Sequence, residues 1–222
     1  NSMRTHKPIL FSQTTRLHWV TKMEFAQEML RDKRFSVDDR KYPIAEKRRK
    51  EFKKAGREIM LEQFENPSML KLDPPDHSRI RKLVQYGFTN RYITSLEPEI
   101  KRVVDGCLDK VHNQDSFDLI EDLAKPLPAI VIAKMMGLPD EDLDQFQNWS
   151  EDLLVGVGGI GTSKEDIKKS GDAYEALIRY FEKIIITRKD SPGDDFIGKL
   201  IQAEEEGDKL NIKEMYGTCL LL

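Results

Sequence analysis

The stretch that decides the fold reads Asp73-Pro74-Pro75-Asp76-His77-Ser78-Arg79-Ile80-Arg81-Lys82-Leu83-Val84. Its pattern predicts the start of a helix, with Asp73 as the N-cap and Pro74 in the first turn. At about 100° per residue, one face of this helix is apolar and is expected to be buried. That face carries Ile80, Leu83, Val84 and, just beyond, Gly87.

Two polar side chains flank the apolar face. His77 and Arg81 are spaced i and i+4, so they lie side by side on one flank, whereas Arg79 and Lys82 are expected to point to solvent. Two donors held half-buried beside an apolar wall suit a carboxylate attached to an apolar body, and a haem propionate has that form. A partly buried histidine and a surface ion-pair arginine would explain the same two residues equally well.

Composition excludes several classes of protein. The chain has 222 residues, with 36 Lys and Arg against 39 Asp and Glu, which gives no basis for general nucleic-acid affinity. No apolar run approaches the ~20 residues of a membrane span, and the N-terminus lacks the order of a signal peptide. We therefore predict a cytoplasmic protein without a membrane anchor. Cys107 and Cys219 are expected to be buried, reduced thiols, and the four histidines show no metal-ligand spacing.

The remaining periodicity predicts a mainly α fold with a small N-terminal β-hairpin. The hairpin pairs residues 8–11 with 17–20, and Thr21 is expected to cap a helix over 24–31 with Phe25, Met29 and Leu30 inward. Residues 117–120 are expected to be extended. Helices are expected over 97–113, 126–136, 139–154, 163–189 with Ser163 as the cap, 194–206, and from the capping box at Asn211 to residue 222. The 126–136 helix is apolar all round, which is typical of a helix buried in a large core.

Two segments allow more than one interpretation. Residues 38–66 are dense in charge, and the lysines and arginines could form a nucleic-acid patch, although neighbouring acids favour a solvated helix or mobile loop. Residues 156–161 are glycine-rich without a preceding strand, so they are expected to connect two helices and not to bind phosphate.

The opening stretch resembles the D-P-P-[DE]-H-x-R-x-R-[KR]-L-V segment of bacterial cytochromes P-450, the haem-thiolate monooxygenases. Residues 87–91 continue the likeness, although Asn90 stands where the family usually has Pro. Further matches lie at residues 19–24, 31–36 and 126–139. The resemblance implies the N-terminal half of the P-450 fold: a single incomplete domain over residues 1–222, truncated at the start of the long central helix. In this family His77 and Arg81 would bind a propionate of haem b.

The resemblance also implies an activity for the complete protein. A P-450 inserts one oxygen atom from O2 into a substrate, here a small apolar organic molecule, with electrons from a ferredoxin or flavodoxin. The axial Cys ligand is expected outside this chain, so we expect no catalytic or metal-binding residue within it and no activity of the chain alone. Arg79 and Lys82 are expected to face the redox partner, because residues 76–91 hold one acid and four Arg or Lys residues. We expect the complete protein to be monomeric.

The alternative is a helical interaction module without a cofactor, for which the helical pattern alone would suffice. It does not account for the ordered series of motif matches. The sequence does not indicate which substrate is used.

Overall fold

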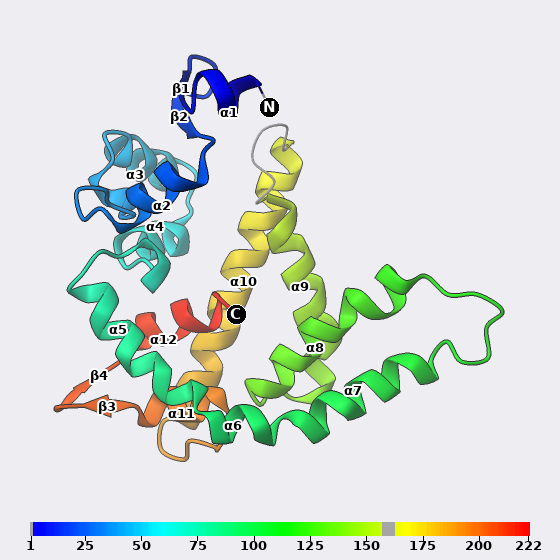
Figure 1. The fold of residues 1–222 in the computed structure, drawn as a ribbon. Helices are drawn as coiled ribbons and strands as arrows, with labels where there is room; N and C mark the ends of the chain where they lie inside the picture. The colour runs from blue at the N-terminus through cyan, green and yellow to red at the C-terminus, as the bar shows by residue number, and fades with distance from the viewer. Residues whose placement is uncertain (1, 157–162) are drawn as a thin grey trace.

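The computed structural model describes residues 2–156 and 163–222, which form a mainly helical fold with two small antiparallel hairpins (Figure 1). The α-helices and β-strands are α1 (Ser2–His6), β1 (Ile9–Ser12), β2 (Leu17–Val20), α2 (Met23–Arg31), α3 (Ala45–Lys54), α4 (Glu58–Glu65), α5 (Asp76–Gln85), α6 (Asn90–Ser95), α7 (Glu97–Asp109), α8 (Pro126–Met135), α9 (Leu143–Val155), α10 (Lys164–Arg188), α11 (Phe196–Gln202), β3 (Glu204–Glu205), β4 (Asp208–Lys209) and α12 (Ile212–Cys219). Short helical turns are η1 (Asp39–Lys41), η2 (Met69–Lys71), η3 (Tyr86–Phe88), η4 (Ile120–Ala124) and η5 (Asp140–Asp142).

The predicted N-terminal hairpin is confirmed, with Ile9 paired to Val20 in an antiparallel register. The predicted cap of the next helix is wrong. The Thr21 hydroxyl donates instead to the Pro8 carbonyl, at 3.2 Å, and so closes the base of the hairpin. Leu30 was expected to face inward, but it is 81% exposed. The apolar residues of α2 are therefore only partly covered in this chain.

The charged segment forms two helices whose charges are largely paired within the segment. Arg49 binds Glu65 on α4 at 2.5 Å, and Lys47 lies 3.8 Å from Glu51 one turn away. Lys50 reaches Glu46 at 3.7 Å. These contacts agree with the solvated-helix interpretation and leave little free positive charge for a nucleic acid.

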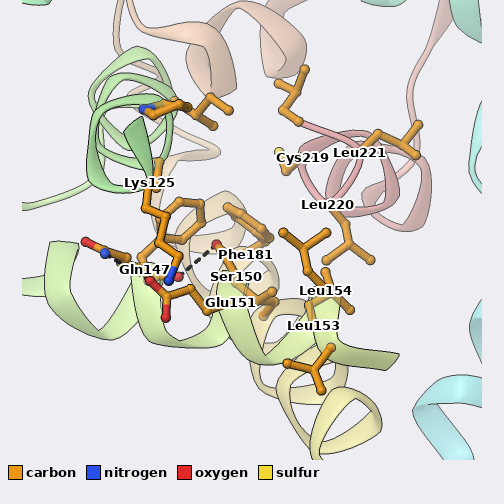
Figure 2. A pocket seen from close by; sticks show the side chains of 17 residues that line it. Lys125, Gln147, Ser150, Glu151, Leu153, Leu154, Phe181, Cys219, Leu220 and Leu221 are labelled. Atoms are coloured by element: carbon orange, nitrogen blue, oxygen red, sulfur yellow. Dashed lines mark hydrogen bonds between the residues drawn. The ribbon is translucent and has the colours of Figure 1, made fainter. Parts of the chain in front are cut away.

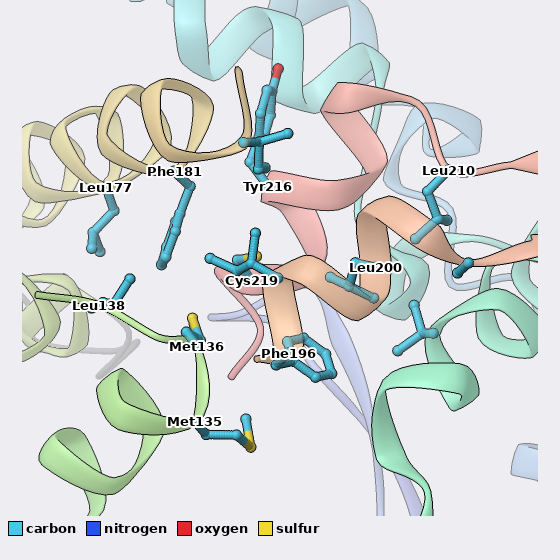
Figure 3. Close-up of a cluster of buried hydrophobic side chains, with 14 of the residues drawn as sticks. Met135, Met136, Leu138, Leu177, Phe181, Phe196, Leu200, Leu210, Tyr216 and Cys219 are labelled. Atoms are coloured by element: carbon cyan, nitrogen blue, oxygen red, sulfur yellow. The ribbon is translucent and has the colours of Figure 1, made fainter. Parts of the chain in front are cut away.

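The core lies where α10, α11 and α12 meet the C-terminal end of α8 and the apolar face of α5 (Figure 3). The predicted burial on α5 is confirmed, since the side chains of Ile80, Leu83 and Val84 are at most 3% exposed. Gly87 lies directly against the ring of Phe196. A Cβ at position 87 would be 2.5 Å from that ring, so the contact requires glycine.

One arginine joins three of these elements. At the end of α10, Arg188 donates to the Asp195 carboxylate at 2.9 Å, to the Met136 carbonyl at 3.2 Å and to the Gly137 carbonyl at 2.5 Å. Asp195 in turn caps α11 through the Gly198 amide, at 2.9 Å. This network holds the end of α8 against α10 and the start of α11.

Burial along α8 is lower than predicted, and α7 is buried on only part of its surface. Only Ala133 and Met135 are buried within α8, although its sequence is apolar all round. On α7, Val103 and Cys107 are buried, but Ile100 and Leu108 remain exposed. Figure 1 shows α7 extending to one side of the molecule, where few elements cover it. This region therefore has more apolar side chains than the rest of the described chain covers.

Two further segments differ from their predicted structure. Residues 117–120 are not extended, because the Asp118 carboxylate accepts hydrogen bonds from the amides of Ile120 and Glu121 and starts the turn η4. The helix predicted over 194–206 ends at Gln202, and the β3–β4 hairpin follows, with Gly207 in the left-handed region at φ 84°. The predicted glycine-rich connection covers residues 156–161. Of these, only Gly156 belongs to the described residues.

The helix expected from Asn211 is largely buried over residues 216–219. Tyr216 and Cys219 are 2% and 1% exposed because α12 packs on α10 and α11. Met215 and residues 220–221 are half-buried, and Leu222 is exposed. The capping boxes at Ser163 and Asn211 are both present. In the part of the chain that the structure describes, no helix is both long and apolar enough to cross a membrane.

Candidate cofactor-binding site

The predicted start of α5 is wrong by two residues. Asp73 does not cap the helix; α5 begins at Asp76. The Asp73 carboxylate instead accepts hydrogen bonds from Lys41 Nζ at 2.6 Å, from the Ser36 hydroxyl at 2.5 Å and from the Val37 amide at 3.1 Å. These donors, Lys41 first, lower the pKa of Asp73 from 3.8 to about 2. Asp73 therefore ties the segment before α3 to the chain just ahead of α5.

His77 and Arg81 occupy one flank of α5, one helical turn apart, as the spacing predicts. The His77 side chain is half-buried, as expected. Arg81 was also expected to be half-buried, but its side chain is exposed. Within residues 2–156 and 163–222, no side chain forms a hydrogen bond or ion pair with either the imidazole or the guanidinium. Both groups are thus available to an acceptor from outside this chain.

Arg79, by contrast, does not face solvent freely. Its guanidinium binds the carboxylate of Asp208 on β4 at 3.1 Å and that of Glu214 on α12. Glu214 also accepts from the Asn211 amide at 2.9 Å in the capping box of α12. The solvent-facing orientation predicted for Arg79 is therefore wrong, because two acids more than 120 residues away fold back onto it. Lys82 is exposed, as expected.

Both cysteines are buried free thiols, as predicted. Burial raises the pKa of the Cys219 thiol to about 12, so the thiolate that binds iron is strongly disfavoured there. Among the described residues, no three His, Cys, Asp or Glu side chains are grouped to hold a metal ion.

A large apolar cavity lies away from His77 and Arg81. It has a volume of about 660 Å³, is open on one side, and is lined by residues of α8, α9, α10 and the end of α12 (Figure 2). Leu153, Leu154, Phe181 and Leu221 contribute to its walls, and Lys125 lies at one side. The sequence did not predict this cavity. Its only signal was the excess of apolar residues along α8.

The chain is similar to cytochromes P450 in sequence and in structure. It is 38% identical over 154 residues to a Bacillus subtilis "Cytochrome P450", covering 69% of this chain and 37% of the relative. It is 34% identical over 204 residues to "Cytochrome P450 107B1" of Saccharopolyspora erythraea, covering 91% and 48%. The crystal structure of P450BioI in complex with hexadec-9Z-enoic acid ligated Acyl Carrier Protein superposes with a TM-score of 0.82 at 28% identity, over 99% of this chain and 54% of that one. The chain belongs to the cytochrome P450 family. No family model matches it.

The chain spans less than half the length of these two curated relatives, and about half of the solved P450. This agrees with the prediction of an incomplete P450 fold, mainly α with an N-terminal hairpin. Haem is the cofactor that the family implies. The chain fits such a group in one respect: two hydrogen-bond donors on α5, His77 and Arg81, have no partner among the described residues.

Proposed function

We propose that this chain forms the part of a haem-thiolate monooxygenase that holds one haem propionate, through His77 and Arg81. One observation carries the proposal. On a single helix, Arg79 is paired with two carboxylates, whereas His77 and Arg81 have no partner among the described residues. The guanidinium of Arg81 presents a planar fork that suits a carboxylate, and the imidazole N–H adds a second donor on the same flank.

The complete protein, on this proposal, inserts one oxygen atom from O2 into a small apolar organic substrate. Haem ligated by a cysteine thiolate supplies the O–O cleavage chemistry. The axial cysteine lies outside this chain, since Cys107 and Cys219 are buried within the helical core. His77 and Arg81 neutralise and orient the propionate, while the apolar face of α5 fixes the helix that carries them. The chain alone is therefore inactive.

Electrons come from a ferredoxin or flavodoxin, which docks on the exposed side of α5 near Lys82. Arg79 is a poor probe of this docking, because its reversal to Glu would place a third carboxylate beside Asp208 and Glu214. Lys82→Glu is the better test, because the Lys82 side chain is exposed. It should slow reduction by an acidic donor, with a smaller defect as salt rises, and should spare peroxide-driven turnover.

A cofactor-free helical module is disfavoured by the family membership. The carbon-monoxide difference spectrum of the reduced protein separates the two proposals. The full-length protein should give the Soret band of a thiolate-ligated haem, and residues 1–222 alone should give none. A full-length protein that binds no haem would overturn the proposal.

A further inference from the structure

Polar side chains flank the buried face of α5 on both sides, and the proposed function uses only one flank. At about 100° per residue, the buried apolar side chains lie between His77 and Arg81 on one flank and Arg79 on the other. A rotation of α5 about its own axis therefore moves all three polar groups together. Whatever holds Arg79 also holds the direction of the two donors across the helix.

Arg79 binds two elements that are distant in sequence. Its Nη1 donates to the Asp208 carboxylate on β4 at 3.1 Å, and its Nη2 donates to the Glu214 carboxylate on α12. Glu214 is itself held in place, because it accepts from the Asn211 amide at 2.9 Å in the capping box of α12. The Glu214 side chain is 14% exposed, so salt screens its pair with Arg79 less than it screens a surface pair.

These ion pairs restrain α5 differently from its apolar face. Burial of apolar side chains holds the helix against the core, but it is not directional, so it tolerates a small rotation. A charge-assisted hydrogen bond weakens steeply when its donor turns away from the acceptor. Because Arg79 makes two such contacts to two different elements, it resists rotation of α5 in the middle of the helix.

We propose that Arg79 is a positioning residue for the donor pair on the opposite flank of α5. Its ion pairs with Asp208 and Glu214 fix the rotation of the helix. That rotation sets the direction in which His77 and Arg81 donate to a haem propionate, so the inference rests on the proposed function. Arg79 does not bind the propionate itself, since its guanidinium is already bound to two carboxylates on the other flank.

Haem transfer from the full-length protein to apomyoglobin tests the inference through a double-mutant cycle. Arg79→Gln removes both ion pairs, and it should speed haem loss about 5- to 20-fold because two hydrogen bonds become misaligned. In a protein that already carries His77→Ala and Arg81→Ala, the same change should leave the rate unaltered, because no donors remain to be oriented. Glu214→Gln should also speed haem loss in the wild-type background, and it keeps the capping box of α12.

Arg57→Gln is the matched control. Arg57 is half-buried like Arg79 and also binds two carboxylates, those of Asp172 at 2.6 Å and Glu175 at 3.5 Å, both on α10. Its replacement should leave haem loss unchanged.

Three results would overturn the inference: no acceleration by Arg79→Gln, an equal acceleration in both backgrounds, or an equal acceleration by Arg57→Gln. The last two would mean that the loss of ion pairs loosens the fold as a whole. Glu214→Gln decides the question in the same way if the Arg79 variant does not fold. Haem retention by the His77→Ala, Arg81→Ala protein as long as by wild type is a different result, because it refutes the proposed function and the inference with it.

Discussion

Asp73 illustrates how a long-range contact can override a local one. Its position before two prolines is typical of a helix cap, but its carboxylate is bound by donors more than 30 residues earlier in the chain. Thr21 departs from its predicted role for the same reason, since the Pro8 carbonyl lies within reach once the hairpin has closed. Capping is predictable when both partners are local, as at Ser163 and Asn211. It is not predictable when tertiary structure supplies a competing partner.

The lowered pKa of Asp73 makes a prediction about pH. Its folded pKa of about 2 lies below the ordinary value of 3.8, so its ionised form stabilises the fold above the higher value. That contribution is lost progressively as the pH falls through about 4 towards 2. Asp73→Asn should therefore lower the urea midpoint at pH 6 and flatten its pH dependence over that window. Asp115→Asn, which changes an exposed loop acid, should behave like wild type. If the pH dependence of the urea midpoint were unchanged in Asp73→Asn, the pKa of Asp73 would not be lowered in the folded protein.

The prediction for α5 is correct for its apolar face, but it is wrong for the contacts that its polar side chains make. Periodicity is a property of the helix itself, so Ile80, Leu83 and Val84 are buried as expected. The environment of Arg79 depends on where β4 and α12 return, and no local signal carries that information. His77 and Arg81 remain a predicted site. The prediction rests on their spacing and on the family motif, and no contact among the described residues tests it.

The packing of η3 against α11 makes a prediction at the scale of elements. Gly87→Ala would place a methyl group 2.5 Å from the fully buried ring of Phe196, and overpacking of this kind costs ~1–3 kcal/mol of unfolding free energy. Gly106→Ala is the matched control, because no atom lies within 4 Å of its added Cβ in the middle of α7. It should stabilise the fold by ~0.5–1 kcal/mol. Denaturant unfolding measures both, and equal effects would contradict the packing described for Gly87.

At the scale of the molecule, the chain carries more apolar surface than it covers. Leu119 and Ile120 are 58% and 56% exposed beside the half-covered helix α8, and the 660 Å³ cavity opens among further leucines. The sequence of α8 is apolar on all sides, and this pattern predicted a helix buried in a closed core. In this chain α8 packs on α7, α9 and η4, but most of its side chains are only half-buried, so its burial was overestimated.

Residues 1–222 in isolation should therefore self-associate at micromolar concentration, with a sedimentation coefficient that rises with concentration. The double variant Leu119→Lys, Ile120→Lys should reduce that association without shifting the melting temperature much, because both side chains are already exposed. A monodisperse wild-type monomer that melts cooperatively would contradict this account.

The central claim is that α5 presents His77 and Arg81 to a haem propionate, and the rate of haem transfer from the full-length protein to apomyoglobin tests it most directly. Each charge-assisted hydrogen bond is worth ~1.5–3 kcal/mol, or about 10- to 150-fold in affinity. Arg81→Ala should speed haem loss more than His77→Ala, the double variant should lose haem fastest, and Gln85→Ala, exposed on the same helix, should match wild type. A double variant that retains haem as long as wild type would contradict the claim.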